Sequence, residues 1–294
     1  MRRSSATLIG FTAVLMWALL ALLSAASGNV PPFQLAAMTF LIGGLMGAVT
    51  WPFRKGAVSA LRQSWQVWLL GVAGLFGYHF VYFSAIRAAP AVEVSLIAYL
   101  WPLFLVVFSA FLPGERLRIH HLVGVVLGLA GAVLIITRGK GLSLGEGFTS
   151  GHVLAFLCSL IWSGYSVLSR RFGQVSTDVV AGFCIVTALL SVICHLLFET
   201  TVWPADATQW AAVFGLGLLP VGAAFYTWDF GVKHGDIMVL GAASYASPLL
   251  STLVLVAAGF AAFTWPVMAA CLLITLGAVI AAKDMLFKRA GPAI

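Results

Sequence analysis

YHFVYFSAIRAAPAVEVSLIAYLWP, residues 78–102, holds most of the polar chemistry of an otherwise very apolar chain. It contains the end of one apolar segment, a break that closes at Pro90, and the first half of a second apolar segment. Pro102 lies well inside this second segment. A proline inside a helix frees the carbonyl four residues earlier, here that of Ala98, and bends the helix. A membrane tolerates such loosened backbone where it faces protein or a cavity, so the stretch predicts a kinked helix beside an interior space.

The composition of the chain indicates an integral membrane protein. Of its 294 residues, 62% are hydrophobic and 9% are charged, whereas soluble domains are about half apolar and a quarter charged. The net charge of +7 comes from short basic clusters between apolar segments, which is typical of topology signals rather than of a nucleic-acid-binding surface. The cysteines lie in apolar runs without metal-ligand spacing and are interpreted as packing residues: Cys158, Cys184, Cys194 and Cys271.

Apolar windows of about 20 residues predict ten membrane-spanning helices, so the expected fold is an all-α polytopic membrane protein. The first run, from Ala6 to Ala26, is kept as a span because it is longer than a signal-peptide core of about 7 to 15 residues. The loops between spans are short and leave no room for a soluble domain. The expected spans are about 5–26, 32–53, 65–88, 90–112, 119–138, 151–172, 177–199, 208–232, 236–259 and 265–287.

Lysine and arginine residues favour one side of this topology. With the N-terminus on the inner side, only Arg87, Arg138 and Lys140 of the 16 basic residues fall outside. Cytoplasmic loops carry such an excess of basic residues. Removing one span from the predicted topology would abolish this excess on one side. We therefore predict that both termini are cytoplasmic.

An internal repeat appears when the sequence is compared with itself at a shift of 146 residues. We predict two five-helix repeats, residues 1–145 and 146–294. Because five is odd, the second repeat must enter the membrane in the opposite orientation. Inverted repeats are common in secondary transporters, which bind substrate near the bilayer midplane between the halves, so we expect a central cavity. The aligned pairs include Gly71 and Gly217, Arg87 and Lys233, Tyr99 and Tyr245, and Pro102 and Pro248.

The two copies differ at the positions that would line this cavity. A pocket between the two copies would be asymmetric, with different side chains on its two walls, which suits a ligand with one polar end. The unequal pairs are His79 and Phe225, Tyr82 and Trp228, and Trp101 and Ser247.

Four tryptophans lie near the middle of their spans, whereas aromatic residues of membrane proteins usually sit at the two interfaces. Indole and phenol rings combine a stacking face with one hydrogen-bonding tip, so we expect these side chains around a substrate. The central tryptophans are Trp17, Trp101, Trp162 and Trp228.

His79 and Tyr82 share one helix face, and Tyr78 precedes them directly. A neutral histidine inside a span either forms a hydrogen bond across helices or faces a cavity. Polar groups at this depth tend to mark pathways, so these residues and the mid-span Tyr99 are candidates for binding the polar end of a substrate.

Charged residues near the helix breaks have a structural interpretation. Arg87 and Lys233 fall at expected helix ends, and Glu93 and Asp236 at expected helix starts, as helix dipoles prefer. Asp229 is the one acid placed well inside a late span. It either carries a coupling ion or forms an ion pair near the cytoplasmic end.

Several chemistries lack their residues. The first span contains no acidic residue for proton exchange, and the chain contains no HExxH or P-loop motif; its GxSxG match, residues 141–145, lies in a loop between two expected spans and not in a strand-to-helix elbow. These observations argue against an enzyme, and the short loops argue against a scaffold. We expect no cofactor and no metal site.

The motifs resemble those of the drug/metabolite transporter superfamily in its EamA-type branch, and within it those of the bacterial exporters of aromatic amino acids. The resemblance covers nearly the whole chain. One departure is that no Gly-Glu-Arg follows the ninth span. The matching segments are residues 7–10 with Trp17, the YLWP run at 99–102, Gly114-Glu115-Arg116, His234-Gly235, and Ser244-Tyr245 with residues 248–251.

This resemblance implies a ten-helix transporter of the bacterial inner membrane that exports phenylalanine, tyrosine and tryptophan through a central cavity. The site residues that it implies are Trp17, Tyr99, Trp101, Pro102, Trp162, Ser244 and Tyr245. His79, Tyr78 and Tyr82 are candidates from their own chemistry.

The leading hypothesis is a monomeric carrier for amino acids that works by alternating access, with Pro102 and Pro248 as the bends about which helix halves move. The alternative is efflux of drugs or of other small metabolites such as purine or sugar derivatives. The driving force is left open between downhill flux and weak proton coupling through His79 or Asp229. The expected partners are a small-molecule substrate and the lipid bilayer, with no nucleic acid.

Overall fold

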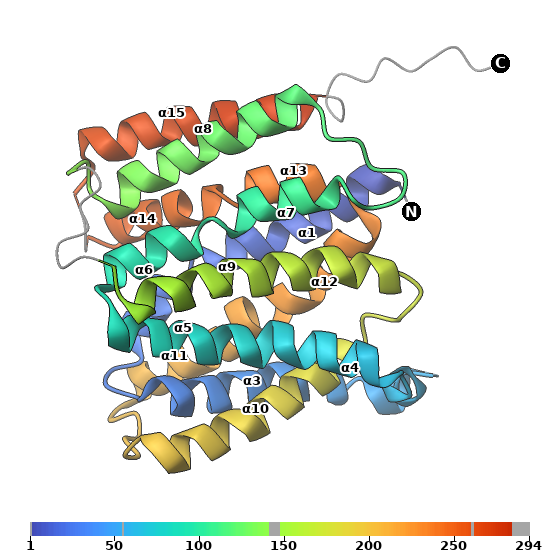
Figure 1. Cartoon of the computed structure of the whole chain (residues 1–294). Coiled ribbons are helices and arrows are strands. Elements are labelled where there is room, and N and C mark those ends of the chain that lie inside the picture. Colours follow the sequence, from blue (N-terminus) through green and yellow to red (C-terminus); the bar gives the residue numbers. More distant parts are fainter. Residues whose placement is uncertain (1, 55, 141–147, 260–261, 284–294) are drawn as a thin grey trace.

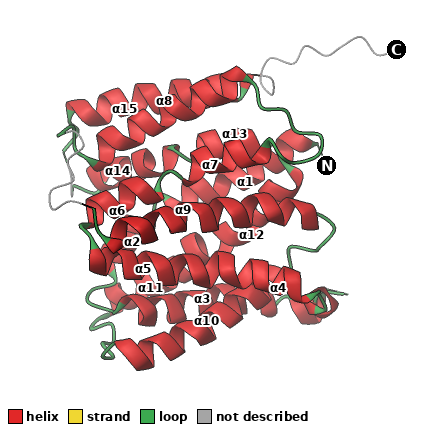
Figure 2. Cartoon of the chain, in the orientation of Figure 1, coloured by secondary structure: helices red, strands yellow, loops and turns green. Residues whose placement is uncertain are grey.

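The computed structural model describes residues 2–54, 56–140, 148–259 and 262–283, and every regular element in them is helical (Figure 2). The prediction of an all-α polytopic fold is confirmed. Eight helical segments are long and apolar enough to cross a membrane, and the shorter apolar helices Glu93–Ser109 and Trp265–Ala281 lie at the fourth and tenth expected spans. The expected junction between the repeats, together with Lys55, Lys288 and Arg289, lies outside the described residues.

The helices of the first half are α1 (Arg3–Trp17), α2 (Leu20–Ala26), α3 (Pro32–Ala48), η1 (Trp51–Phe53), η2 (Val58–Leu61), α4 (Trp65–Val72), the π-helical η3 (Ala73–Gly77), α5 (Tyr78–Ala88), α6 (Ala91–Ala98), α7 (Trp101–Ser109) and α8 (Ile119–Ile136). Those of the second half are α9 (Ser150–Ser169), η4 (Arg170–Phe172), α10 (Val179–Phe198), α11 (Ala207–Leu218), the π-helical η5 (Leu219–Ala223), α12 (Ala224–His234), α13 (Ile237–Ala243), α14 (Ala246–Ala257) and α15 (Trp265–Ala281).

The helix boundaries recur with the spacing of the sequence repeat. Adding 146 to residues 73–77 gives 219–223, the bounds of the second π-helical turn, and adding 146 to residues 78–88 gives 224–234, the bounds of α12. α1 starts at the end of the bundle where the N-terminus lies, whereas its counterpart α9 starts at the opposite end (Figure 1). The two sets of helices therefore run in opposite directions.

Two spans are interrupted at equivalent places. α6 gives way to α7 after Ala98, and α13 gives way to α14 after Ala243. Pro102 and Pro248 follow these interruptions and have no N–H to donate to the preceding turn. The interruptions place irregular backbone inside the bundle, where protein covers it.

The main helix pairs take one member from each half: α1 packs on α12, α3 on α10, α5 on α9, and α8 on α15 (Figure 1). α1 and α12 meet at Gly10 and Gly231, where a Cβ on Gly231 would lie 2.4 Å from the Cα of Gly10. Only glycine allows two backbones to approach this closely. Since α1 carries Trp17 and α12 carries Trp228, the glycine contact sets how closely these two indoles meet.

Candidate functional site

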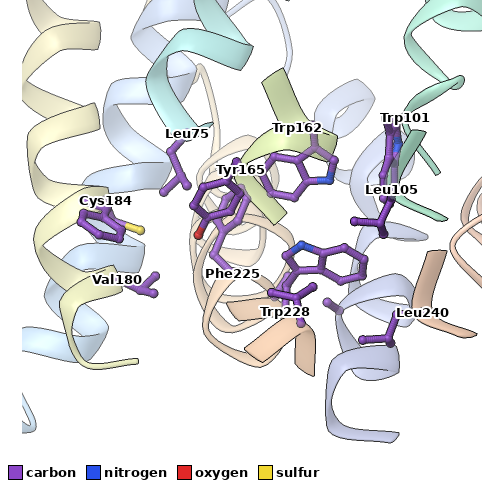
Figure 3. Packing of buried hydrophobic residues seen from close by; sticks show 14 of the residues in the cluster. Leu75, Trp101, Leu105, Trp162, Tyr165, Val180, Cys184, Phe225, Trp228 and Leu240 are labelled. Atoms are coloured by element: carbon purple, nitrogen blue, oxygen red, sulfur yellow. The ribbon is translucent and has the colours of Figure 1, made fainter. Parts of the chain in front are cut away.

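Four tryptophans from both halves meet at the centre of the bundle. Trp17 ends α1, Trp101 starts α7, Trp162 lies in α9 and Trp228 lies in α12. Their ring centroids are 5.1 to 6.4 Å apart in all six pairs, within the range of favourable aromatic contacts. We call this group the tryptophan cluster, and Figure 3 shows three of its members. The structure thus brings together the four tryptophans that lie mid-span in the sequence.

Two members of the tryptophan cluster are held by hydrogen bonds to the protein. Trp17 Nε1 donates to the carbonyl oxygen of Pro220 at 3.0 Å, and Trp228 Nε1 donates to Ser166 Oγ at 3.0 Å. Pro220 lies in η5, and a π-helical turn departs from the ordinary helical hydrogen-bond pattern. The orientations of both indoles are therefore set by the protein itself.

Trp101 and Trp162 differ from these two. Their side chains are 7% and 5% exposed, and within the described part of the chain neither indole N–H donates a hydrogen bond to the protein. Buried indole N–H groups usually find a partner. The two N–H groups are therefore available as donors to a bound ligand.

Tyr78 and Tyr82 extend the tryptophan cluster along α5. The Tyr78 ring lies 5.7 Å from the Trp162 ring and stacks on the Tyr82 ring at 6.0 Å. The Tyr82 hydroxyl is 3.4 Å from Ser95 Oγ of α6. The two phenols thus connect the tryptophans to the broken fourth span.

His79 lies against phenylalanine rings from both halves, 5.0 Å from Phe40 and 6.5 Å from Phe225. Its Nδ1 is 2.7 Å from the carbonyl oxygen of Leu75. Because a carbonyl only accepts, we assign the proton to Nδ1, and Nε2 of the neutral imidazole is then an acceptor. The Phe225 ring in turn is 5.7 Å from the Trp162 ring, so His79 joins the tryptophan cluster through Phe225.

Tyr99, Ser244 and Tyr245 lie in another part of the bundle. Tyr245 is fully buried against α8, where a Cβ on Gly128 would lie 2.7 Å from the tyrosine ring. Tyr99 packs against the buried group that contains Tyr245. Ser244 Oγ donates to the carbonyl oxygen of Leu240 at 2.7 Å. Among the described residues, no ring contact joins Tyr99 or Tyr245 to the four tryptophans, and both tyrosines pack in the buried group beside α8. Tyr99 lies near Tyr78 and Tyr82 as well, so it borders the extension of the tryptophan cluster along α5.

Aromatic rings fill the space in which the sequence predicts a chamber. Trp228 is 0% exposed, and Phe225 and Trp162 are each 5% exposed. A ligand the size of an amino acid therefore has to displace rings or separate helices to reach the free indole N–H groups. Binding at the tryptophan cluster is thus coupled to movement of the helices that carry it.

Ion pairs close the end of the bundle where the N-terminus lies. Glu115 Oε1 accepts from Arg3 Nη2 and from Arg170 Nη2, each at 2.7 Å. Arg170 Nη1 also donates to the carbonyl oxygens of Val232 and Gly235, at 3.0 and 2.8 Å. Glu115 belongs to the first half and Arg170 to the second, so this network ties the halves together.

Two further pairs join the halves at the opposite end. His152 Nε2 donates to Glu93 Oε2 at 2.7 Å, and Arg87 Nη2 lies 3.6 Å from Glu199 Oε1.

Asp236 caps α13 by accepting from the backbone N–H of Val239 at 3.2 Å, as expected of an acid at a helix start. Among the residues that the structure describes, no three histidine, cysteine or acidic side chains gather as metal ligands would.

The EamA-like transporter family matches the chain twice, over residues 4–137 and 149–282. The chain belongs to the EamA-like transporter family. The resemblance seen in the motifs is thereby confirmed, and this EamA-like protein is a multi-pass membrane transporter.

Several exporters are similar to this EamA-like transporter over most of its length. The aromatic amino acid exporter YddG of Ancylobacter novellus is 55% identical over 282 residues, which cover 96% of this chain and 98% of that protein. YddG of Escherichia coli is 25% identical over 270 residues, 86% of this chain and 88% of the relative. The pseudopaline exporter CntI of Pseudomonas aeruginosa is 27% identical over 227 residues, 75% of this chain and 76% of the relative. A crystal structure with 54% sequence identity superposes with a TM-score of 0.90, over 98% of this chain and all of the other.

Some residues of the site were missed from the sequence. Tyr165 lies three residues after Trp162, and this spacing could have placed it on the same helix face; the two ring centroids are 5.3 Å apart. Phe225 aligns with His79 in the repeat and could have been chosen on that ground. The carbonyl of Pro220 had no signal, because the sequence does not show where a π-helical turn forms.

Proposed function

We propose that this EamA-like transporter exports amino acids across the bacterial inner membrane, with phenylalanine, tyrosine and tryptophan preferred, by alternating access and as a monomer. The observation that carries the proposal is the pair of free indole N–H donors, Trp101 and Trp162, inside a cluster built from both halves. A flat aromatic ring suits the indole faces. The 55% identical exporter from Ancylobacter novellus, whose name specifies aromatic amino acids, supports the same substrate class.

The polar end of the substrate is assigned to the side of α5. His79 Nε2 is an acceptor for the α-ammonium group, and the hydroxyls of Tyr78 and Tyr82 are donors for the α-carboxylate. The repeat offers no equivalent set, since Phe225 and Trp228 occupy the positions of His79 and Tyr82. One polar wall and one aromatic wall match a zwitterion that carries an aromatic side chain.

Alternating access rests on the two opposed sets of helices, residues 1–145 and 146–294. The breaks beside Pro102 and Pro248 let the two parts of each span change their angle. The Glu115 network holds one end closed. We assign this end to the cytoplasm, because in the described residues it collects Arg3, Arg54, Arg116 and Arg170 while the other end carries Arg87 and Arg138.

Counterflow in proteoliposomes tests this function. Vesicles loaded with unlabelled tryptophan should take up labelled tryptophan only when they contain the protein. Trp101→Ala and His79→Ala should lower the uptake about ten-fold or more, since each removes a contact worth roughly 1.4 kcal/mol or more. Trp203→Ala serves as the matched control, because Trp203 is 62% exposed and lies in the loop between α10 and α11. No uptake by the wild type, or equal uptake by all three variants, refutes the proposal.

A second candidate is efflux of other small compounds, and the similarity to a pseudopaline exporter favours it. Competition in the same vesicles separates the two. If planar dyes or purine derivatives compete as well as phenylalanine, the aromatic amino acid assignment fails while the transport mechanism stands.

A further inference from the structure

A small recess lies beside the tryptophan cluster, on its Tyr165 side. Its volume is about 10 Å³, enough for roughly one water molecule. Both halves line it: Val67 and Gly71 come from α4, Tyr165 from α9, and Asp229 and Lys233 from α12. In Figure 3, Tyr165 lies next to Trp162, and its hydroxyl points away from Trp101.

The recess contains a buried ion pair. Lys233 Nζ and Asp229 Oδ2 are 2.8 Å apart, and their side chains are 3% and 2% exposed. Asp229 also accepts from Thr177 Oγ1 at 2.7 Å, and Lys233 donates to the carbonyl oxygen of Val175 at 3.1 Å. A buried ion pair is costly to desolvate and adds little net stability, whereas charged groups inside membrane spans commonly mark a path for substrate or ions. Stability alone therefore does not explain why the pair lies there.

The Tyr165 hydroxyl supplies a second, independent observation. Tyr165 is 3% exposed, and its hydroxyl has no partner at hydrogen-bond distance among the described residues, although Ser169, which also lines the recess, lies near it. Leaving a buried hydroxyl without a partner is unfavourable. A phenylalanine would fill the same space without this penalty. The Tyr245 hydroxyl is also without a partner, but it packs beside α8, whereas Tyr165 lines the recess together with Asp229 and Lys233, so the Tyr165 hydroxyl points to a ligand of the recess.

We propose that this recess is a second binding site for the substrate, which takes the zwitterionic part of an amino acid when the end that carries the N-terminus opens. The α-ammonium group binds Asp229, and the α-carboxylate binds Lys233 and the Tyr165 hydroxyl. The apolar side chain lies against the walls formed by Val67 and Gly71. The proposal rests on the proposed function of amino acid export.

The location fits a site between the entrance and the tryptophan cluster. The Tyr165 ring is 5.3 Å from the Trp162 ring, and Asp229 directly follows Trp228. Opening of the recess requires α4 to separate from α9 and α12, which belong to the other half. The opposite end differs at the equivalent positions, where Phe83 and Arg87 replace Asp229 and Lys233.

Tyr165→Phe is the sharpest test. It removes no hydrogen bond from the closed protein, so the melting temperature should be unchanged or higher. The KM for tryptophan counterflow should rise about ten-fold, the usual effect of losing a hydrogen bond to a charged group. Tyr226→Phe is the matched control: its hydroxyl donates to the carbonyl oxygen of Gly43 at 3.0 Å and lies outside the recess. This variant should melt at a lower temperature and keep the wild-type KM.

Selectivity tests the assignment of charges. Indole-3-propionate lacks the ammonium group and tryptamine lacks the carboxylate, so both should compete poorly with tryptophan for the wild type. Asp229→Asn should lower the preference for tryptophan over indole-3-propionate about ten-fold, and Lys233→Met the preference over tryptamine by a similar factor. If either charge variant fails to fold, Tyr165→Phe alone decides.

The outcomes separate the two proposals. A KM within two-fold of the wild type in Tyr165→Phe, with normal tryptophan counterflow, refutes the recess site and leaves the export function intact. Absence of tryptophan counterflow in the wild type refutes both.

Discussion

Gly231→Ala should loosen the contact that holds α1 and α12 together. The new Cβ would lie 2.4 Å from the Cα of Gly10 and 3.1 Å from its backbone nitrogen, whereas carbon atoms in contact are about 3.5 to 4.0 Å apart. The atoms met are backbone atoms, so no side chain can rotate away. The two helices must separate by about 1 Å.

Overpacking of this kind costs roughly 1 to 3 kcal/mol, and the better helix propensity of alanine returns about 0.5 to 1 kcal/mol of it. The free energy of unfolding should therefore fall by up to about 2.5 kcal/mol. Trp17 and Trp228, on the same two helices, should move apart, and tryptophan counterflow should slow. Gly10→Ala should have a smaller effect, because its Cβ would lie 2.9 Å from the Cα of Gly231.

Gly164→Ala in α9 is the matched control, because a Cβ there would meet nothing within 4 Å. It should raise the free energy of unfolding by about 0.5 to 1 kcal/mol through helix propensity alone. The assay is thermal unfolding of the purified protein in one detergent, followed by counterflow in proteoliposomes. Equal melting temperatures for Gly231→Ala and Gly164→Ala would refute the reasoning that backbone contact sets the helix distance.

Three further substitutions test other parts of the site. Trp101→Phe removes an indole N–H that has no partner in the described protein. It also leaves a void among the rings that Trp101 contacts, so the melting temperature should fall while the KM for tryptophan rises about ten-fold; an unchanged KM would count against Trp101 as a ligand donor. Glu115→Gln leaves Arg170 with a weaker partner at a site where the carboxylate is 7% exposed. It should lower the free energy of unfolding, measured by thermal unfolding, by about 2 kcal/mol; a loss no larger than that from breaking a more exposed pair, such as Arg54 and Asp178, would contradict this. Tyr245→Phe should keep the KM within two-fold, because Tyr245 packs on α8; a large rise in KM would place Tyr245 at the substrate.

Much of the site was foreseeable because its signals are local in the sequence. Trp17, Trp101 and Trp162 lie in the middle of apolar runs, where an interfacial role is excluded by position. These indole rings meet because they lie at the same mid-membrane depth, where a side chain in a small bundle has few other helices to contact. Pro102 likewise marks the break in the fourth span, because a missing N–H acts on its own helix.

Tyr245 and Asp229 show where local signals end. Tyr245 aligns with Tyr99 and follows a similar motif, yet whether its ring meets substrate or α8 depends on Gly128, a residue 117 positions earlier. Asp229 and Lys233 are four residues apart, so their ion pair was foreseeable from helix geometry. That this pair borders a recess beside Tyr165 depended on how α4, α9 and α12 pack.

The amino-acid sequence by itself predicted ten spans in two opposed repeats and indicated the family, because span length and charge placement depend on the bilayer rather than on the other helices. The tertiary structure decided which hydrogen-bonding groups are satisfied. The indole N–H groups of Trp17 and Trp228 donate to the protein, whereas within the described residues those of Trp101 and Trp162 do not and the hydroxyls of Tyr165 and Tyr245 have no partner. This difference arises because a side-chain donor reaches an acceptor only where two helices cross at the right height, and the crossing is set by contacts such as that between Gly10 and Gly231.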